Sequence, residues 1–286
     1  MIILDGAMGT TLWDIAQRNG AEKVPVWRYN IEHPEFVAEI TRRYIDAGAD
    51  FVQANTFGAN RPAVKKSSKY DVKDVVAAGM RIARETAAGK DVKIFLSSGP
   101  LMEMLEPYGD LEEDECREIY GEIFDAAMPY KPDAILLETF IDLGMMRVAA
   151  ERAMETDIPV FCSMSFEKSG RTMFGNSVED VVGTLEPLGI TAVGLNCSLG
   201  PDSAVPIIKD FSGKTSLPLI FKPNAGLPVT TEGAKTTSAV GPKEFAEAVS
   251  AAFPYVTYVG GCCGSDWRYV EAIKEKLLEK DPYVYN

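Results

Sequence analysis

Three cysteines are the residues of this chain whose type and placement best suit chemistry. Cys262 and Cys263 are adjacent within the glycine-rich segment 260–264, and Cys197 directly follows Asn196. Three thiolates that meet at one point can hold Zn²⁺ in a tetrahedral site with its fourth position open, as catalytic zinc sites require. The glycines allow the backbone to turn tightly enough for both neighbouring cysteines to reach one ion.

A sulfur-rich site also indicates a class of substrate. Zinc lowers the pKa of a bound thiol and keeps it as a thiolate at neutral pH. Such a thiolate can attack a methyl group on a good leaving atom. The spacing alone also allows a metal-activated water, as in a zinc hydrolase. Two other interpretations stay open here. The cysteines could pack as small hydrophobic side chains, or they could form a redox disulfide, which adjacent cysteines make only with strain.

The remaining cysteines and the single histidine are expected to lie outside this site. Cys116 falls in an acidic helical segment, and Cys162 falls inside a buried strand. His33 precedes Pro34 at a helix start. Five cysteines are too few and too odd in number for a disulfide framework, and reduced thiols suit a cytosolic setting.

A repeated strand-and-helix unit positions these residues. Eight short apolar or β-branched runs are expected to be strands: 2–5, 51–55, 93–97, 134–138, 160–165, 192–196, 219–222 and 257–261. Segments with helical periodicity lie between these runs and after the last one: 34–47, 72–88, 112–128, 142–155, 178–188, 203–210, 242–252 and 268–278. The alternation indicates parallel βαβ units. Eight of them predict an α/β fold, a (β/α)8 TIM barrel forming one domain over residues 1–286, in preference to an open doubly wound sheet.

Composition excludes several functions. The net charge of −13 argues against binding to nucleic acid. No run approaches the roughly 18 to 20 apolar residues that span a membrane, and the N-terminus lacks the features of a signal peptide. The chain is therefore expected to be cytoplasmic, with neither a membrane nor a nucleic acid as partner. The acidic segment 110–115 is expected to be a solvated helix start.

The motifs at the strand ends resemble those of the homocysteine S-methyltransferase family. That family includes the homocysteine-binding module of cobalamin-dependent methionine synthase and betaine–homocysteine methyltransferase. The resemblance spans nearly the whole chain and rests on segments 4–10 (LDGAMGT), 55–57 (NTF), 138–140 (ETF), 194–197 (GLNC) and 260–264 (GGCCG). It implies that the three cysteines bind Zn²⁺ and that the sulfur of homocysteine takes the fourth position.

The resemblance also implies a place for the amino-acid part of the substrate. Glu138 would pair with the substrate ammonium, while Asp5 and the backbone amides around Gly6 and Ala7 would help to place its head. Asn196 would either hold the ligand loop or touch the substrate, and both roles stay open. The expected reaction forms methionine by in-line displacement at a methyl carbon. No protein base is needed, and no catalytic residue beyond the metal site is expected.

A separate methyl-corrinoid protein is the expected methyl donor, with S-methylmethionine, betaine or a folate as alternatives. Betaine-using relatives carry an aromatic residue directly after the glutamate, whereas here Thr139 follows it and Phe140 is expected on the opposite face of the strand. Residues 98–101 (SGPL) also depart from the Gly-Pro-Thr of relatives. No folate or cobalamin module is expected after Asn286. The alternative function is that of a thiol-binding subunit of a larger methyl-transfer complex.

Overall fold

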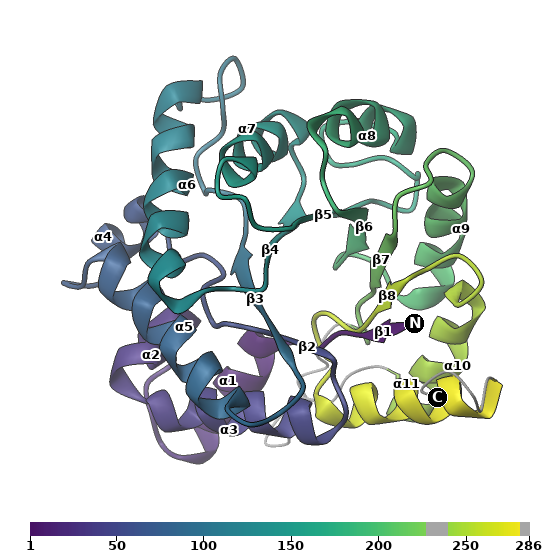
Figure 1. Ribbon diagram of the computed structural model, residues 1–286, viewed down its shortest axis with the longest axis horizontal. Coiled ribbons are helices and arrows are strands. Elements are labelled where there is room, and N and C mark those ends of the chain that lie inside the picture. The colour runs from purple at the N-terminus through teal and green to yellow at the C-terminus, as the bar shows by residue number, and fades with distance from the viewer. Residues whose placement is uncertain (227–239, 281–286) are drawn as a thin grey trace.

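The computed structural model describes residues 1–226 and 240–280, and it shows a parallel barrel. The strands lie in the order β1-β8-β7-β6-β5-β4-β3-β2. A parallel bridge between Leu4 and Phe51 brings the two edge strands together and closes the ring (Figure 1). The strands are β1 (Ile2–Ile3), β2 (Phe51–Gln53), β3 (Lys93–Ser98), β4 (Ala134–Phe140), β5 (Val160–Met164), β6 (Ala192–Asn196), β7 (Leu219–Lys222) and β8 (Tyr258–Val259). The predicted (β/α)8 fold is confirmed.

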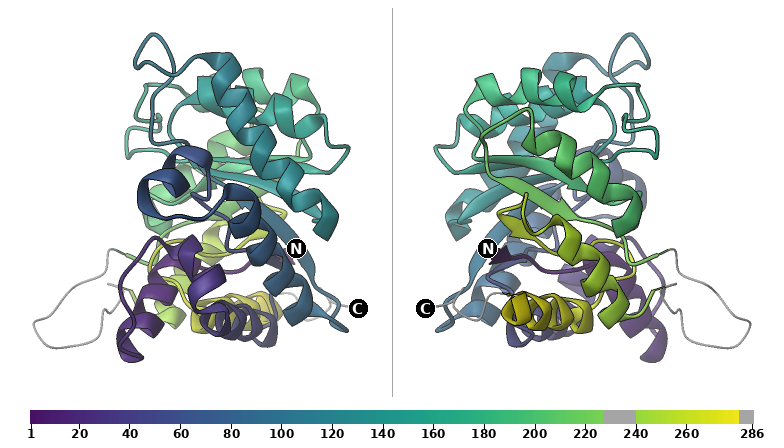
Figure 2. Two further views of the ribbon diagram at one scale, coloured as in Figure 1. Left: turned by 90° about the vertical axis from the view of Figure 1, so that its left-hand side faces the viewer. Right: turned by 90° about the vertical axis from the view of Figure 1, so that its right-hand side faces the viewer.

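Helices form a layer outside the strands, as the two side views show (Figure 2). Those that match the predicted segments are α3 (Pro34–Asp46), α5 (Val72–Ala87), α6 (Glu113–Ala127), α7 (Leu143–Met154), α8 (Val178–Leu185), α9 (Pro201–Ser212), α10 (Pro242–Val249) and α11 (Trp267–Lys280). Three were not predicted: α1 (Met8–Arg18), α2 (Tyr29–Glu32) and α4 (Arg61–Ser67). Within the described ranges, no helix is long and apolar enough to cross a membrane.

Two groups of apolar side chains hold the barrel together. The larger one packs between the strands and the surrounding helices. The smaller one fills the barrel interior, where Phe51 stacks on Phe95 at 4.4 Å between ring centroids and Phe161 meets Tyr258 edge-on at 5.0 Å. Most of its members are among the first residues of their strands. The aromatic plug therefore lies toward the amino ends of the strands, which leaves the carboxyl ends for polar side chains.

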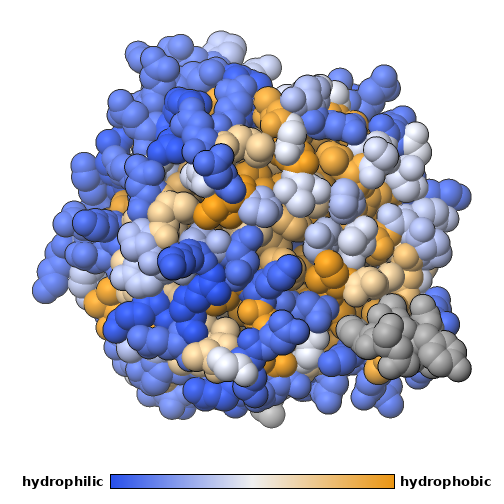
Figure 3. Space-filling model, viewed as in Figure 1, coloured by the Kyte–Doolittle hydropathy of each residue, from blue (hydrophilic) through white to orange (hydrophobic). Residues whose placement is uncertain are grey.

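The amphipathic helices explain why polar side chains cover most of the outer surface. In the view of Figure 3, apolar side chains gather toward the middle of the face, and the periphery is mostly hydrophilic. Buried positions in each helix recur at helical spacing, as with Phe36, Val37, Ile40 and Tyr44 in α3. The buried face of each such helix packs in the larger apolar cluster, against the outer side of the strands.

Candidate metal and substrate site

The three cysteines predicted from the sequence come together at the carboxyl end of the barrel. Cys197 directly follows β6, and Cys262 and Cys263 lie just after β8. Their sulfur atoms all lie within 4.8 Å of one another, and the Sγ atoms of Cys197 and Cys263 are 3.8 Å apart. Zinc–sulfur bonds of about 2.3 Å in a tetrahedron place two sulfurs about 3.8 Å apart. The donor set and its spacing therefore fit a tetrahedral zinc ion.

The end of β7 holds both cysteine loops in place. The backbone N–H of Cys197 donates to the carbonyl of Lys222 at 3.1 Å, and that of Cys262 donates to the carbonyl of Pro223 at 2.9 Å. Cys197 and Ser198 adopt left-handed backbone angles, with φ of 61° and 56°. Non-glycine residues rarely adopt this conformation, and it persists only where surrounding contacts impose it, often at functional sites.

The cysteine cluster already favours one thiolate. Hydrogen bonds from the thiols of Cys262 and Cys263 lower the pKa of Cys197 to about 3. The same contact with Cys197, together with burial, raises the pKa of Cys262 well above its usual value and that of Cys263 to about 11. Asn224 also lowers the pKa of Cys197 by hydrogen bonding. Cys197 is therefore the thiolate of the cluster, and Cys262 and Cys263 hold their protons until a metal displaces them.

The other two cysteines lie elsewhere in the fold. Cys116 is buried in α6 and Cys162 is buried in β5. Burial raises the pKa of the Cys116 thiol to about 12 and raises that of Cys162 further. Neither belongs to the cluster of potential metal ligands. His33 is not part of that cluster either, and its Nδ1 lies 3.0 Å from the carboxylate of Glu35.

Glu138, at the end of β4, extends into the barrel from the strand opposite β8. One carboxylate oxygen, Oε1, accepts hydrogen bonds from Ser97 Oγ at 2.6 Å and from Gln53 Nε2. The other, Oε2, lies 3.9 Å from Lys222 Nζ. Burial raises the pKa of Glu138, while Lys222 and the two hydrogen-bond donors oppose that rise.

Asp5 is held by residues that the sequence did not single out. Its Oδ1 accepts from Lys222 Nζ at 3.1 Å, and its Oδ2 accepts from the backbone N–H of Gln53 at 2.7 Å. Lys222 also donates to Gln53 Oε1 at 2.8 Å. Burial alone would lower the pKa of Lys222, but the carboxylates of Asp5 and Glu138 raise it above its usual value. A lysine closing an apolar strand was the available signal, since lysine is rarely buried without partners.

Asn196 links the end of β4 to the cysteine cluster. Its Oδ1 accepts from the backbone N–H of Thr139 at 2.8 Å, and its Nδ2 donates to Thr139 Oγ1 at 2.8 Å. The same Nδ2 lies 3.8 Å from Cys262 Sγ. Thr139 has a φ of 66°, and the pairing of β4 with β5 is shifted there. Asn196 is fully buried and outside the cavity lining, so this geometry favours holding the loop over touching the substrate.

A cavity of about 530 Å³ opens above these residues. Its described lining includes the three cysteines, Glu138 and Lys222, with Gly6 and Ala7 but not Asp5. The N–H of Ala7 already donates to Ser265 O at 2.8 Å. The neighbouring first turn of α1 also lines the cavity, and no side chain caps it. Its backbone N–H groups can therefore receive an anion.

Apolar and aromatic side chains form the cavity's outer wall, among them Trp13, Trp27, Phe57 and Met102. Phe140 is not one of them. It is buried outside the barrel interior, where its ring lies 6.1 Å from that of Tyr120 in α6. It therefore faces away from Glu138, as expected from the sequence. Regular alternation would place residues 138 and 140 on one face of the strand. The left-handed Thr139 and the register shift between Leu137 and Phe140 turn the ring outward instead.

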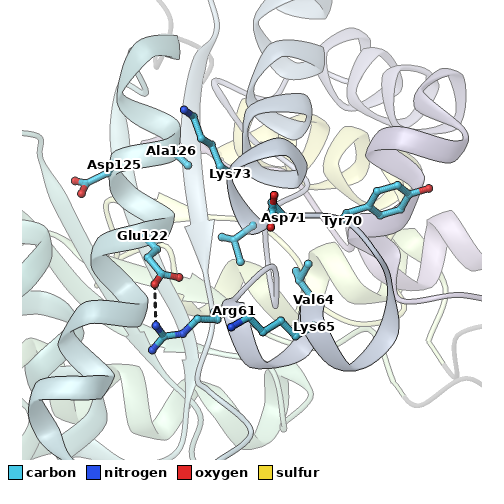
Figure 4. A pocket seen from close by; sticks show the side chains of 10 residues that line it. Arg61, Val64, Lys65, Tyr70, Asp71, Lys73, Glu122, Asp125 and Ala126 are labelled. Carbon is cyan, nitrogen blue, oxygen red and sulfur yellow. Dashed lines mark hydrogen bonds and ion pairs between the residues drawn. The ribbon is translucent and has the colours of Figure 1, made fainter.

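A second cavity of about 580 Å³ lies on the outside of the barrel (Figure 4). Arg61, Lys65 and Lys73 line it together with the acids Glu122 and Asp125. Arg61 pairs with Glu122 at 3.0 Å, so part of this charge is already neutralised within the protein. The described lining offers neither a cysteine cluster nor a strand end.

A family model described as homocysteine S-methyltransferase matches residues 2–277. The chain belongs to this family. Methionine synthase from Mycobacterium leprae is 33% identical over 290 residues, which cover 93% of this chain and 23% of the relative. Methionine synthase from Mycobacterium tuberculosis is 32% identical over 298 residues, covering 96% and 24%. The chain thus spans about a quarter of the length of these curated relatives.

Solved structures place this family member in the same fold. The metallated form of the homocysteine methyltransferase MmuM from Escherichia coli has a TM-score of 0.80 at 19% identity, covering 96% of each chain. Its apo form has a TM-score of 0.74 at 20% identity, covering 96% of this chain and 95% of that one. Both show that this chain has the architecture of that homocysteine methyltransferase.

Proposed function

We propose that this chain binds one zinc ion through Cys197, Cys262 and Cys263 and transfers a methyl group to the sulfur of homocysteine, forming methionine. The observation that carries this proposal is the convergence of three cysteine sulfurs beside Glu138 in one cavity. Family membership supports the same substrate. When bound, zinc would hold the substrate sulfur as a thiolate at neutral pH, which removes the need for a protein base.

Two features of the chain suit the other end of homocysteine. Glu138 Oε2 offers a carboxylate oxygen to the substrate ammonium, a charge-assisted contact that gains strength where water is excluded. The uncapped first turn of α1 offers backbone N–H groups to the substrate carboxylate. With its amino-acid end fixed in this way, the sulfur is held in one place for in-line transfer. In this arrangement Asp5 does not contact the substrate. It holds Lys222 and the backbone of Gln53 by hydrogen bonds.

The proposed methyl donor is a separate methyl-corrinoid protein. Exposed apolar side chains lie on the loops at the carboxyl ends of the strands: Met102 is 88% exposed, Met173 68% and Tyr108 67%. These loops offer a surface suited to a macromolecule rather than to a small ion. Methionine synthases about four times as long as this chain are its relatives, which is compatible with a donor carried on protein. Phe140 packs against α6, which disfavours a betaine site built on it.

The decisive experiment assays zinc-loaded protein with homocysteine against a panel of methyl donors: a methyl-corrinoid protein, free methylcobalamin, S-methylmethionine, betaine and a methylated folate. We expect methionine from the corrinoid protein. Turnover only with a sulfonium or betaine would replace the donor and keep the acceptor. Binding of homocysteine without transfer from any donor would indicate a thiol-binding subunit of a larger complex.

A matched pair of variants tests the metal site. Cys262→Ala is expected to abolish both stoichiometric zinc binding and methyl transfer, because two thiolates cannot complete the site. Cys162→Ser is the control and should keep one zinc per chain, since Cys162 is buried in β5 away from the cluster. Metal analysis of the purified proteins gives the answer. Full zinc occupancy after separate removal of each of the three cysteines would refute the proposal.

A further inference from the structure

Lys222 is a buried lysine whose role the proposed reaction does not yet explain. Its side chain is 2% exposed, and its ammonium contacts Asp5 Oδ1 at 3.1 Å, Gln53 Oε1 at 2.8 Å and, more distantly, Glu138 Oε2 at 3.9 Å. Its backbone carbonyl accepts the N–H of Cys197. One residue thus joins the cysteine cluster to two acids, Glu138 of the cavity lining and the buried Asp5, which does not line the cavity. We call Asp5, Glu138 and Lys222 together the floor of the site.

The hydrogen bonds of the two acids are unequal. Asp5 uses both carboxylate oxygens, one for Lys222 and one for the N–H of Gln53. Glu138 uses only Oε1, which accepts from Ser97 and Gln53. Within residues 1–226 and 240–280, Glu138 Oε2 receives no hydrogen bond. It has only the 3.9 Å ion pair with Lys222. It is the one carboxylate oxygen of this floor still open to a donor.

The formal charges of Asp5, Glu138 and Lys222 also indicate that Glu138 Oε2 is the atom open to a cation. Two carboxylates and one ammonium sum to a formal charge of −1. An uncompensated charge is costly in a site shielded from water, so a single cationic group entering the cavity is favoured. Without Lys222 the floor would carry two negative charges, and one acid would tend to hold a proton instead.

We propose that Lys222 determines specificity by neutralising Asp5, so that Glu138 alone is offered to a substrate ammonium and the site selects thiols that carry one amino group. Lys222 is on this view a positioning residue that does not touch the substrate. The proposal rests on the proposed function, since it assumes that a thiol binds at the cysteines. It concerns the pairing of Lys222 with Asp5 and Glu138, which is separate from the question of which side chains bind the metal.

The test compares two thiols that differ only in the amino group, homocysteine and 4-mercaptobutanoate. Their binding to the zinc-loaded protein is measured by calorimetry, which does not require a methyl donor. The ratio of the two dissociation constants is the discrimination. We expect the unmodified protein to prefer homocysteine by about 10- to 100-fold, the usual effect of a hydrogen bond to a charged group.

Changing the charge balance should change this discrimination. Lys222→Met and, in parallel, the more polar Lys222→Gln should reduce it about tenfold or more, because the two acids then share a proton and Glu138 is offered partly as a neutral carboxyl group. The loss should deepen as pH falls, since the neutral form of Glu138 then becomes more populated. Asp5→Asn should reduce it too, because Lys222 then neutralises Glu138. The double variant Asp5→Asn/Lys222→Met restores a charge of −1 and should recover the discrimination to within about threefold, a coupling that independent structural defects do not produce.

The outcomes separate the two proposals. If the unmodified protein binds neither thiol, the proposed function is wrong and this inference falls with it. If it prefers homocysteine and both Lys222 variants keep that preference, or the double variant shows the summed losses of the single ones, the proposed function stands and the role of Lys222 is refuted. Zinc content of each variant verifies that the cysteine cluster is intact. If either single Lys222 variant fails to fold, Asp5→Asn and the double variant Asp5→Asn/Lys222→Met supply the comparison.

Discussion

Asn196 shows, at the scale of single residues, how one amide can serve two parts of the site. It satisfies the backbone N–H of Thr139, beside Glu138, and also lies against the sulfur of Cys262. Residues around metal ligands commonly fix the orientation of those ligands and affect metal affinity. Because Asn196 is completely buried, its amide has no water to replace either partner.

We therefore expect Asn196→Ala to weaken zinc binding by about 10- to 100-fold. The change removes the amide near Cys262 and leaves the N–H of Thr139 without its acceptor. Competition against a chromogenic chelator measures the affinity. Asn19→Ala is a matched control, since Asn19 follows α1 at the surface and its side-chain amide donates to the carbonyl of Ile15, within its own helix. An unchanged zinc affinity in Asn196→Ala would contradict this account.

Thiol reactivity gives a second residue-scale prediction. At pH 8 the zinc-free protein should react with iodoacetamide at Cys197, whose pKa of about 3 makes it a thiolate. Cys116 should not react, because burial raises its pKa to about 12 and limits access to it. Mass spectrometry of the labelled peptides measures both sites. Added zinc should protect Cys197, and rapid native-state labelling of Cys116 would show that its helix opens more readily than the structure indicates.

The sequence is sufficient to predict a site residue when its type and its position in a strand-end motif already indicate its chemistry. Cys197, Cys262 and Glu138 belong to this class. Lys222 and Gln53 do not, because their importance comes from pairing with Asp5 across the barrel, 217 and 48 positions away along the chain. A sequence shows that a lysine closes an apolar strand, but only the closed barrel shows which acid faces it.

At the scale of elements, β6 and β7 must approach closely enough for β7 to hold the loop of Cys197. Gly194 in β6 makes this possible, since a Cβ there would lie 2.0 Å from the carbonyl oxygen of Ile220 in β7. Backbone atoms cannot move aside as the end of a flexible side chain can. The spacing of these two strands therefore depends on a residue without a side chain.

Gly194→Ala is expected to lower the free energy of unfolding by about 3 kcal/mol or more, the upper range for overpacking a core. Gly183→Ala is the matched comparison, since a Cβ in that exposed position of α8 meets nothing within 4 Å. It should raise stability by about 0.5–1 kcal/mol, the usual gain for alanine over glycine in a helix. Urea denaturation measures both. Equal effects would mean that the close approach of β6 and β7 is not rigid.

The elements that the sequence predicted are those with a clear apolar period. Helices α3 to α11 that flank the strands were located to within a few residues, apart from α4, because one face of each is buried. Helix α1 was not predicted, since Ala7 precedes it without a capping side chain and a glycine lies in its first turn. Helices α2 and α4 have four and seven residues, too short for an apolar period to be recognised.

At the scale of the whole molecule, the barrel separates stability from chemistry. Aromatic rings fill the amino ends of the strands, while the cysteines and the acids occupy the carboxyl ends. Such a division is typical of (β/α)8 barrels. It also means that the cysteine loops are held by several strands rather than by one hairpin, so a ligand that joins them stabilises the folded chain as a unit.

Zinc should therefore stabilise the entire fold. A ligand that binds only the folded state at 100 times its dissociation constant adds about 2.7 kcal/mol, which for a chain of this size corresponds to a rise in Tm of roughly 4–5 °C. Calorimetric scans of the zinc-loaded protein and of protein stripped with a chelator measure that difference. Cys262→Ala should melt near the stripped protein and gain nothing from added zinc, while Cys116→Ser should respond as the unmodified chain does. If the Tm of the unmodified chain is the same with and without zinc, the three sulfurs do not bind zinc in the folded state.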